Sequence, residues 1–169
     1  MRALPLALLP IALLAACSSN ENDPKGTEMT LDATSSTGKK VQANADGNGK
    51  LALDLPGFKA EIAMPKIKLD SANFDMNGAK LYPGSTISAL NITGDAGKDN
   101  GGVQIKFEAP APVDTVKQWF AKELAETAGF TVDVEGTGLK GSTDEGKPFT
   151  LTLGDAGGAT SGTLVFSGN

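Results

Sequence analysis

Residues 103–130, VQIKFEAPAPVDTVKQWFAKELAETAGF, decide the predicted fold. The first six of them alternate apolar and polar side chains, which is typical of a strand with one buried face. From about Pro112 to Ala128 the apolar side chains recur at helical spacing instead, at Val113, Val116, Phe120, Leu124 and Ala128. The stretch therefore predicts a half-buried strand followed by one amphipathic helix.

The ends of this helix carry recognisable signals. Pro112 suits the first helical position, where a missing N–H costs nothing, and Asp114 in the first turn favours the positive end of the helix dipole. Gly129 is expected just after the helix, with Phe130 making the hydrophobic contact that closes it. For Trp119 we expect partial burial against the sheet, with a partner-binding aromatic as the alternative.

Further strands flank the helix in the second half of the chain. They are predicted at 85–92, 103–108, 130–134, 149–153 and 162–166, and a short edge strand around Leu139 is also compatible with the sequence. The order β-β-α-β-β-β predicts an α+β fold, in which one amphipathic helix packs on one face of an antiparallel sheet.

The section before it is predicted to be a set of β-hairpins. Strands are expected at 29–33, 41–44, 50–55 and 58–64, with a hairpin turn at Asp46-Gly47-Asn48-Gly49, because Asp, Asn and Gly accept a positive φ at low cost. In the last of these strands, Phe58, Ala60, Ile62 and Met64 are expected to face inward. The section has too little apolar surface to stand alone with confidence, and we expect it to pack on the second section.

The first residues are predicted to be a targeting segment. A charged start at Arg2, an apolar run from 4 to 14 and the small residues Ala15 and Ala16 have the layout of a secretory signal, and the run is too short to span a bilayer. Residues 18–26 are polar and indicate a flexible tether. The expected organisation is a signal peptide at 1–16, a lipidated tether at 17–26, a β-rich section at 27–77 and an α+β module at 78–169.

Two resemblances add to this prediction. Leu14-Ala15-Ala16-Cys17 resembles the lipobox of bacterial lipoproteins, which implies cleavage before Cys17 and acyl chains on its thiol; an ordinary secretory signal that ends near a cysteine is the alternative. Ser18, where the family's inner-membrane retention signal has Asp, implies the outer membrane, facing the periplasm. The second resemblance covers residues 79–168, which are similar to small modules of uncharacterised bacterial envelope lipoproteins and secreted proteins. It rests on Tyr82-Pro83-Gly84-Ser85, Phe107, the Val116–Phe120–Leu124 helix and Gly129-Phe130, and it implies a fold but no activity.

Composition narrows the functions that fit. Without residues 1–16 the chain has fourteen lysines, twenty acidic residues and a net charge of about −6, with no arginine and no histidine. Nucleic-acid-binding modules are basic and rely on arginine, so no nucleic-acid partner is expected. The lack of histidine excludes a Ser-His-Asp triad and histidine-ligated metal sites. Carboxylates, lysines and hydroxyls remain as candidates for chemistry.

Five segments are candidate sites. Asn44-x-Asp46-x-Asn48-Gly49 overlaps the first half of a calcium loop, but half of the ligands are missing and a hairpin turn is favoured. The loops 95–102 and 155–162 lack the spacing of a phosphate-binding loop and are interpreted as solvated turns. Asp144-Glu145 could act as an acid–base pair, although a turn is favoured. Lys59, Lys66 and Lys68 form a mildly basic strand face that could meet anionic lipid or cell-wall polymer, with a solvated face as the favoured alternative.

The sequence thus predicts a non-enzymatic envelope lipoprotein with a structural, accessory or binding role. Its expected contacts are the membrane, through the lipid on Cys17, and an envelope protein or cell-wall polymer. No catalytic residue, cofactor or metal is expected. The alternatives are a carboxylate-based periplasmic hydrolase or small-ligand carrier, and a calcium-dependent adhesion module that would use the Asp46 loop.

Overall fold

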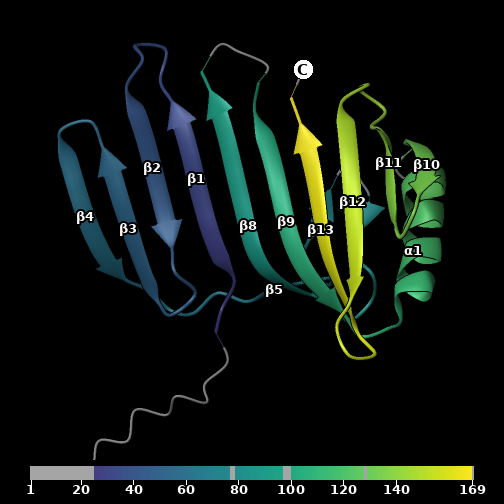
Figure 1. Cartoon of the computed structure of the whole chain (residues 1–169). Helices are drawn as coiled ribbons and strands as arrows, with labels where there is room; N and C mark the ends of the chain where they lie inside the picture. Colours follow the sequence, from purple (N-terminus) through teal and green to yellow (C-terminus); the bar gives the residue numbers. More distant parts are fainter. Residues whose placement is uncertain (1–24, 77–78, 97–99, 128, 169) are drawn as a thin grey trace, which may run out of the picture.

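A computed structural model describes residues 25–76, 79–96, 100–127 and 129–168 of the protein (Figure 1). Cys17 and the lipobox lie outside the described residues. The dominant element is one eleven-stranded sheet, accompanied by a single ten-residue α-helix with a π-helical extension. The α+β prediction is therefore wrong: the fold is mainly β, because one short helix can cover only one end of so wide a sheet.

The strands follow one another mostly as antiparallel neighbours. Their spatial order is β10-β11-β12-β13-β9-β8-β1-β2-β3-β4; in addition β5 pairs with β8, and β6 with β7 in a separate two-stranded sheet. The bounds are β1 Glu28–Thr34, β2 Lys40–Ala45, β3 Lys50–Leu55, β4 Phe58–Ala63, β5 Leu69–Asp70, β6 Asp75–Met76, β7 Ala79–Lys80, β8 Thr86–Asp95, β9 Gly102–Ala109, β10 Thr131–Glu135, β11 Gly138–Ser142, β12 Pro148–Asp155 and β13 Thr160–Ser167. The α-helix, α1, spans Val113–Lys122, and the π-helix, η1, spans Glu123–Thr127.

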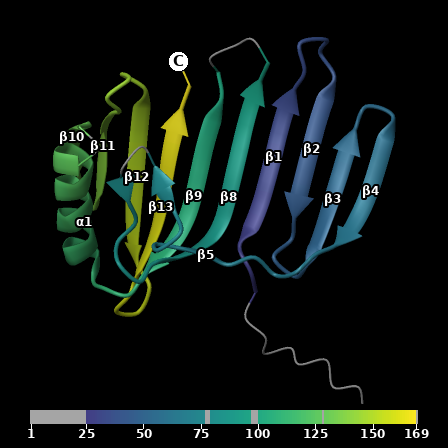
Figure 2. The same cartoon turned by 180° about the vertical axis from the view of Figure 1, so that it is seen from behind.

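The two predicted sections meet within this sheet. β1 pairs with β8 in parallel, from Glu28 opposite Ala89 onward, so the sheet is mixed and not antiparallel throughout as predicted. After β4 the chain runs back along the base of the sheet and enters β8 in the same direction as β1 (Figures 1 and 2). The buried side chain of Thr27 fixes this junction, since its hydroxyl donates to the carbonyl of Ile87 at 2.7 Å and accepts from the amide of Leu69 at 2.9 Å.

The strand registers place apolar side chains on one face of the sheet across its full width. One row of mutually opposed residues consists of Ile62, Leu51, Ala45, Met29, Leu90, Ile105, Leu164, Leu151 and Leu139. The next row consists of Ala60, Leu53, Ala43, Leu31, Ile92, Val103, Phe166 and Phe149. Side chains alternate between the faces of a strand, so the intervening polar residues lie on the opposite face.

Only one end of this apolar face is covered. The helix α1 buries Val116 and Phe120 fully, and Leu124 of η1 is equally buried, which confirms the centre of the predicted apolar stripe; Val113 is half-buried, and Ala128 lies outside the described residues. Phe120 lies 5.5 Å from Phe107 between ring centroids. Phe107 in turn lies over Gly162 of β13, where an added Cβ would come within 2.1 Å of the ring. The segment carrying β5, β6 and β7 also lies over this end of the sheet (Figure 2).

The helix begins one residue later than predicted and ends as expected. Pro112 is the N-cap, without a side-chain capping bond, and Val113 is the first helical residue. At the other end Gly129 has a φ of +69°, and the amide of Phe130 donates to the carbonyl of Leu124 at 3.0 Å. This bond spans six residues and closes the π-helical end. Phe130 is buried, and its ring contacts are Phe149 and Phe166.

Tyr82-Pro83-Gly84-Ser85 forms a turn that positions an aromatic contact on the helix. The amide of Ser85 donates to the carbonyl of Tyr82 at 3.0 Å, and Gly84 supplies the positive φ of +79° that a type II turn requires. The ring of Tyr82 then meets Trp119 edge-on at 5.6 Å. Trp119 is half-buried, so the expected partial burial is confirmed, although its ring contacts are Tyr82 and Phe120.

The other end of the apolar face is uncovered in the described structure. Phe58 and Ile62 of β4 are 55% and 46% exposed, so the prediction that they face inward is wrong. They do share one face with the core, but no helix or second sheet lies over β1–β4 (Figures 1 and 2). We call this surface the open apolar face; its side chains are Leu31, Ala33, Val41, Ala43, Leu51, Leu53, Leu55, Phe58, Ala60 and Ile62.

None of the helices in the described part of the chain has the length and apolar character needed to cross a lipid bilayer.

Candidate functional site

An apolar groove lies where the covered end of the sheet gives way to the open apolar face. Its volume is about 570 Å³, which is within the usual range for small-molecule sites. The apolar lining comes from β8, β9, β13 and the segments beside them: Phe74, Leu90, Ile92, Val103, Phe130 and Phe166. The polar rim includes Thr143, Glu145 and Lys147 from the β11–β12 hairpin, and the last two form an ion pair at 2.9 Å.

The groove continues directly into the open apolar face. Ile92 lines the groove, and it stands opposite Leu31 in the β8–β1 register. Both side chains are more than a third exposed, at 38% and 39%. From Leu31 the apolar row continues through Ala43 and Leu53 to Ala60 at the edge of the sheet. Groove and face together form one apolar surface, closed on one side and open on the other.

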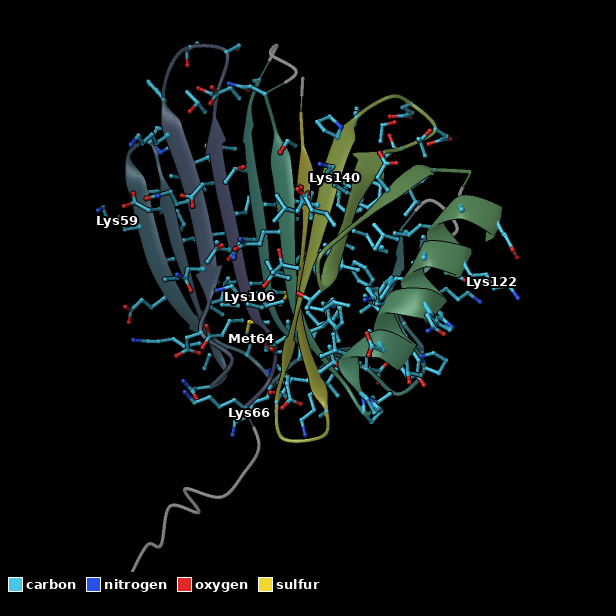
Figure 3. All side chains as sticks on the ribbon, turned by 45° about the vertical axis from the view of Figure 1, so that its right-hand side comes forward. Lys59, Met64, Lys66, Lys106, Lys122 and Lys140 are labelled. Atoms are coloured by element: carbon cyan, nitrogen blue, oxygen red, sulfur yellow. The ribbon has the colours of Figure 1, made fainter. Side chains whose placement is uncertain are left out.

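The opposite face of the same strands is polar and internally paired. Asn91 on β8 donates to the side-chain oxygen of Gln104 at 3.0 Å. Lys59 on β4 forms an ion pair with Asp54 at 2.8 Å, and Lys50 forms one with Glu61 at the same distance. Lys106 and Lys140 lie on this face as well, and Lys59 is at its outer edge (Figure 3). The sheet therefore has a sharply amphipathic cross-section.

The segment that overlaps a calcium loop is built as a hairpin turn, the alternative that the sequence favours. One carboxylate oxygen of Asp46 accepts the amide of Asn48 at 2.8 Å and that of Lys50 at 3.1 Å. Gly47 and Gly49 adopt φ values of +69° and +98° and lie against Gly26 and Met64, where a Cβ would clash with backbone. Asp46 thus serves the turn. In the described part of the chain, no three His, Cys, Asp or Glu side chains gather in an arrangement that could hold a metal ion.

The other candidate residues do not come together in one site. Lys59 lies on the polar face of β4, whereas Lys66 and Lys68 lie in the irregular segment after it. Glu145 is paired with Lys147 at the groove rim, and the carboxylate of its neighbour Asp144 accepts the amide of Glu145 at 3.0 Å. In the loop after β12, Asp155 accepts the amide of Gly158 at 3.3 Å, as in a turn. Residues 97–99 of the other glycine-bearing loop lie outside the described residues.

Acid should weaken the Asp46 turn selectively. The amide of Asn48, which donates to the carboxylate, holds the pKa of Asp46 below its ordinary value of 3.8. Because this pKa is lower in the folded state than in the unfolded one, the stabilisation is complete above that value and is lost as the pH falls through the folded pKa. We expect Asp46→Asn to show a flatter loss of melting temperature in acid than the wild type. Asp133→Asn removes an exposed strand carboxylate and controls for the change in net charge. If the melting temperatures of the wild type and Asp46→Asn fell equally with decreasing pH, the Asp46 carboxylate would not stabilise the turn.

Comparison of the chain with protein-family models, curated proteins and solved structures finds no match. The candidate site therefore rests on the geometry of the chain itself. Sequence reasoning missed the groove, since its lining comes from segments between Phe74 and Phe166 that only the sheet brings together.

Proposed function

We propose that the protein is a non-enzymatic lipoprotein of the bacterial envelope, anchored by lipid on Cys17, which binds the hydrocarbon chain of a lipid molecule in the apolar groove and along the open apolar face. The observation that carries the proposal is the continuity of these two surfaces through Ile92 and Leu31. Exposed apolar surface of this extent on a folded domain marks a site of interaction.

The shape of the surface favours a long, flexible and apolar ligand. The groove, lined by Phe74, Phe130 and side chains of the sheet, would hold part of such a chain, and the remainder would lie on the open face. Burying an apolar chain there removes both surfaces from water, which contributes about 25 cal/mol for each Å² of apolar area buried. Glu145 and Lys147, whose side chains are more than half exposed at the rim, would meet a polar head group.

The binding part of this proposal is tested with a fluorescent long-chain fatty acid and the mature chain, residues 17–169. Serine replaces Cys17 so that no detergent is needed. We expect saturable binding by the wild-type surface and at least a tenfold weaker affinity for Ile92→Lys, because the ammonium group would enter the apolar junction between groove and face. Fluorescence titration gives both dissociation constants.

Asn44→Lys is the matched control, since it adds the same charge on the polar face of β2. It should bind the fatty acid as the wild type does. Equal affinity for Ile92→Lys and Asn44→Lys, or no binding by the unsubstituted surface, would overturn the proposal.

A further inference from the structure

The strand β4 ends the large sheet, and its outer edge has no partner among the described strands. An edge strand presents unpaired backbone groups that can pair with another chain. The amide of Met64 donates to the carbonyl of Gly49 at 2.9 Å, toward β3. Along an antiparallel strand, the backbone N–H and C=O groups of successive residues point alternately toward one neighbour and toward the other. The backbone groups of Ile62, Ala60 and Phe58 therefore also bond to β3. Those of Lys59 and Glu61 point away from β3, toward the free edge.

The side chains of β4 match those of a second β4 running the other way. In a twofold pairing centred on Ala60, Lys59 of one copy stands opposite Glu61 of the other, and Phe58 stands opposite Ile62. Both charged residues bond outward, as the ladder requires, and both apolar residues lie on the open apolar face. Opposite charges and apolar residues that face each other across strands are the pairs that stabilise sheets.

The neighbouring registers lack this match. Centring the pairing on Lys59 or on Glu61 places that charge directly against its own copy, which is destabilising. A shift by one residue would set apolar side chains against polar ones. The register centred on Ala60 also extends the existing ion pairs, because Lys59 is already bonded to Asp54 and Glu61 to Lys50. Charges of alternating sign would then run across the junction.

The other edge of the sheet does not share this property. β10 is the terminal strand at that end, and a twofold pairing about its centre would set Asp133 against Asp133. β4 is therefore the edge suited to a copy of itself, and a twofold contact of this kind closes after two chains.

We infer that the protein forms a twofold dimer by antiparallel pairing of β4 with β4 of a second copy, in the register that places Ala60 opposite Ala60. The dimer joins the two sheets edge to edge, brings Phe58 against Ile62 across the junction and makes the two open apolar faces continuous. This inference goes beyond the proposed function, because it uses the strand edge and not the groove.

A single cysteine at the symmetry axis tests the register. Ala60 opposite its own copy is a non-hydrogen-bonded pair, in which the Cα atoms lie about 4.5 Å apart, within the range that a disulfide bridges. We expect Ala60→Cys in the full-length chain, expressed in a bacterial envelope and mildly oxidised, to yield a covalent dimer as its main species. Leu53→Cys is the matched control: it lies opposite Ala60 on β3, on the same face, and its two copies would be roughly 14 Å apart.

Charge reversal tests the pairing independently. In the Ala60→Cys chain, Glu61→Lys should lower the dimer yield several-fold, because it sets lysine against Lys59. Adding Lys59→Glu should restore the yield, since the pair is then reversed but complementary. If the partner were a different protein, adding Lys59→Glu would not restore the yield of the disulfide-linked product, because that protein would keep its own charges.

Three outcomes would overturn the inference: no dimer from Ala60→Cys, equal dimer yields from Ala60→Cys and Leu53→Cys, or a disulfide from Ala60→Cys to a different protein. The wild-type chain, with Cys17 alone, controls for bonds made by that residue. None of these outcomes depends on fatty-acid binding, so the dimer and the proposed function can fail separately.

Discussion

Phe120→Ala is expected to lower the free energy of unfolding by about 3–5 kcal/mol, the usual cost of removing a buried phenylalanine ring. Phe120 is fully buried, and its ring packs 5.5 Å from Phe107 and 5.0 Å from Trp119. It is the central residue of the only helix that covers the described sheet. Because small domains are stable by about 5–15 kcal/mol, this single change should remove a large part of the total. Equilibrium unfolding in urea measures it.

Phe58→Ala is the matched control, because it removes the same ring from the open apolar face. Phe58 is 55% exposed, so its loss should change the unfolding free energy by well under half of the Phe120 effect. Equal losses for the two variants, at a protein concentration at which the chain is monomeric, would mean that another part of the same chain covers Phe58, and the open face would not exist as described.

Cys17→Ala is expected to move the protein from the membrane fraction to the soluble fraction of the cell. The proposed anchor depends on the thiol of this residue, and stable attachment requires more than one acyl chain. Without the thiol no acyl chain can be attached there. Fractionation followed by mass spectrometry of the amino-terminal peptide measures both the location and the lipid.

Ser18→Ala is the neighbouring control and should leave the protein in the membrane fraction. If Cys17→Ala stayed in the membrane after a high-salt wash although its residues 1–16 had been removed, the anchor would be refuted. The fatty-acid titration uses a chain without the lipid on Cys17. The fractionation result would therefore leave the test of fatty-acid binding unaffected.

Local structure was largely predictable from the sequence. The strand Lys50–Leu55 has the predicted bounds, and the stripe of Val116, Phe120 and Leu124 is buried as predicted. These features follow from side-chain periodicity and from turn residues such as Gly129, which act over a few neighbouring positions. The strand around Leu139, expected at an edge, lies instead between β10 and β12, because the strand after η1 became the edge.

The arrangement of strands was not predictable in the same way. Alternation shows that Phe58 and Ile62 share a face, but not whether another layer covers that face. Nor does it show that β1 pairs with β8 in parallel, since this depends on the path of the chain between them. The α+β prediction is wrong for this reason: it sets the helix beside the strands of one module only, whereas the sheet spans both sections.

In the candidate sites too, local features were predictable from the sequence and long-range ones were not. Asp46 could be assigned to a turn from its Asn and Gly neighbours alone, and the structure agrees. The groove could not be found, because Phe74, Val103 and Phe166 are far apart in the chain and carry no motif. A binding surface made of ordinary core residues left uncovered has no signature in sequence.

The parallel contact of β1 with β8 has a consequence for how the chain acquires its structure. The strands β1–β4 are joined by short turns and can pair as soon as they are available, whereas the bond from Thr27 to Ile87 closes a loop of 60 residues. Closing such a loop is entropically costly and slows the contacts that depend on it. A chain delivered amino terminus first would therefore hold a four-stranded meander with two unpaired edges until β8 arrived. The docking of β8 on β1, like that of β13 on β9, is thus a slow step of folding.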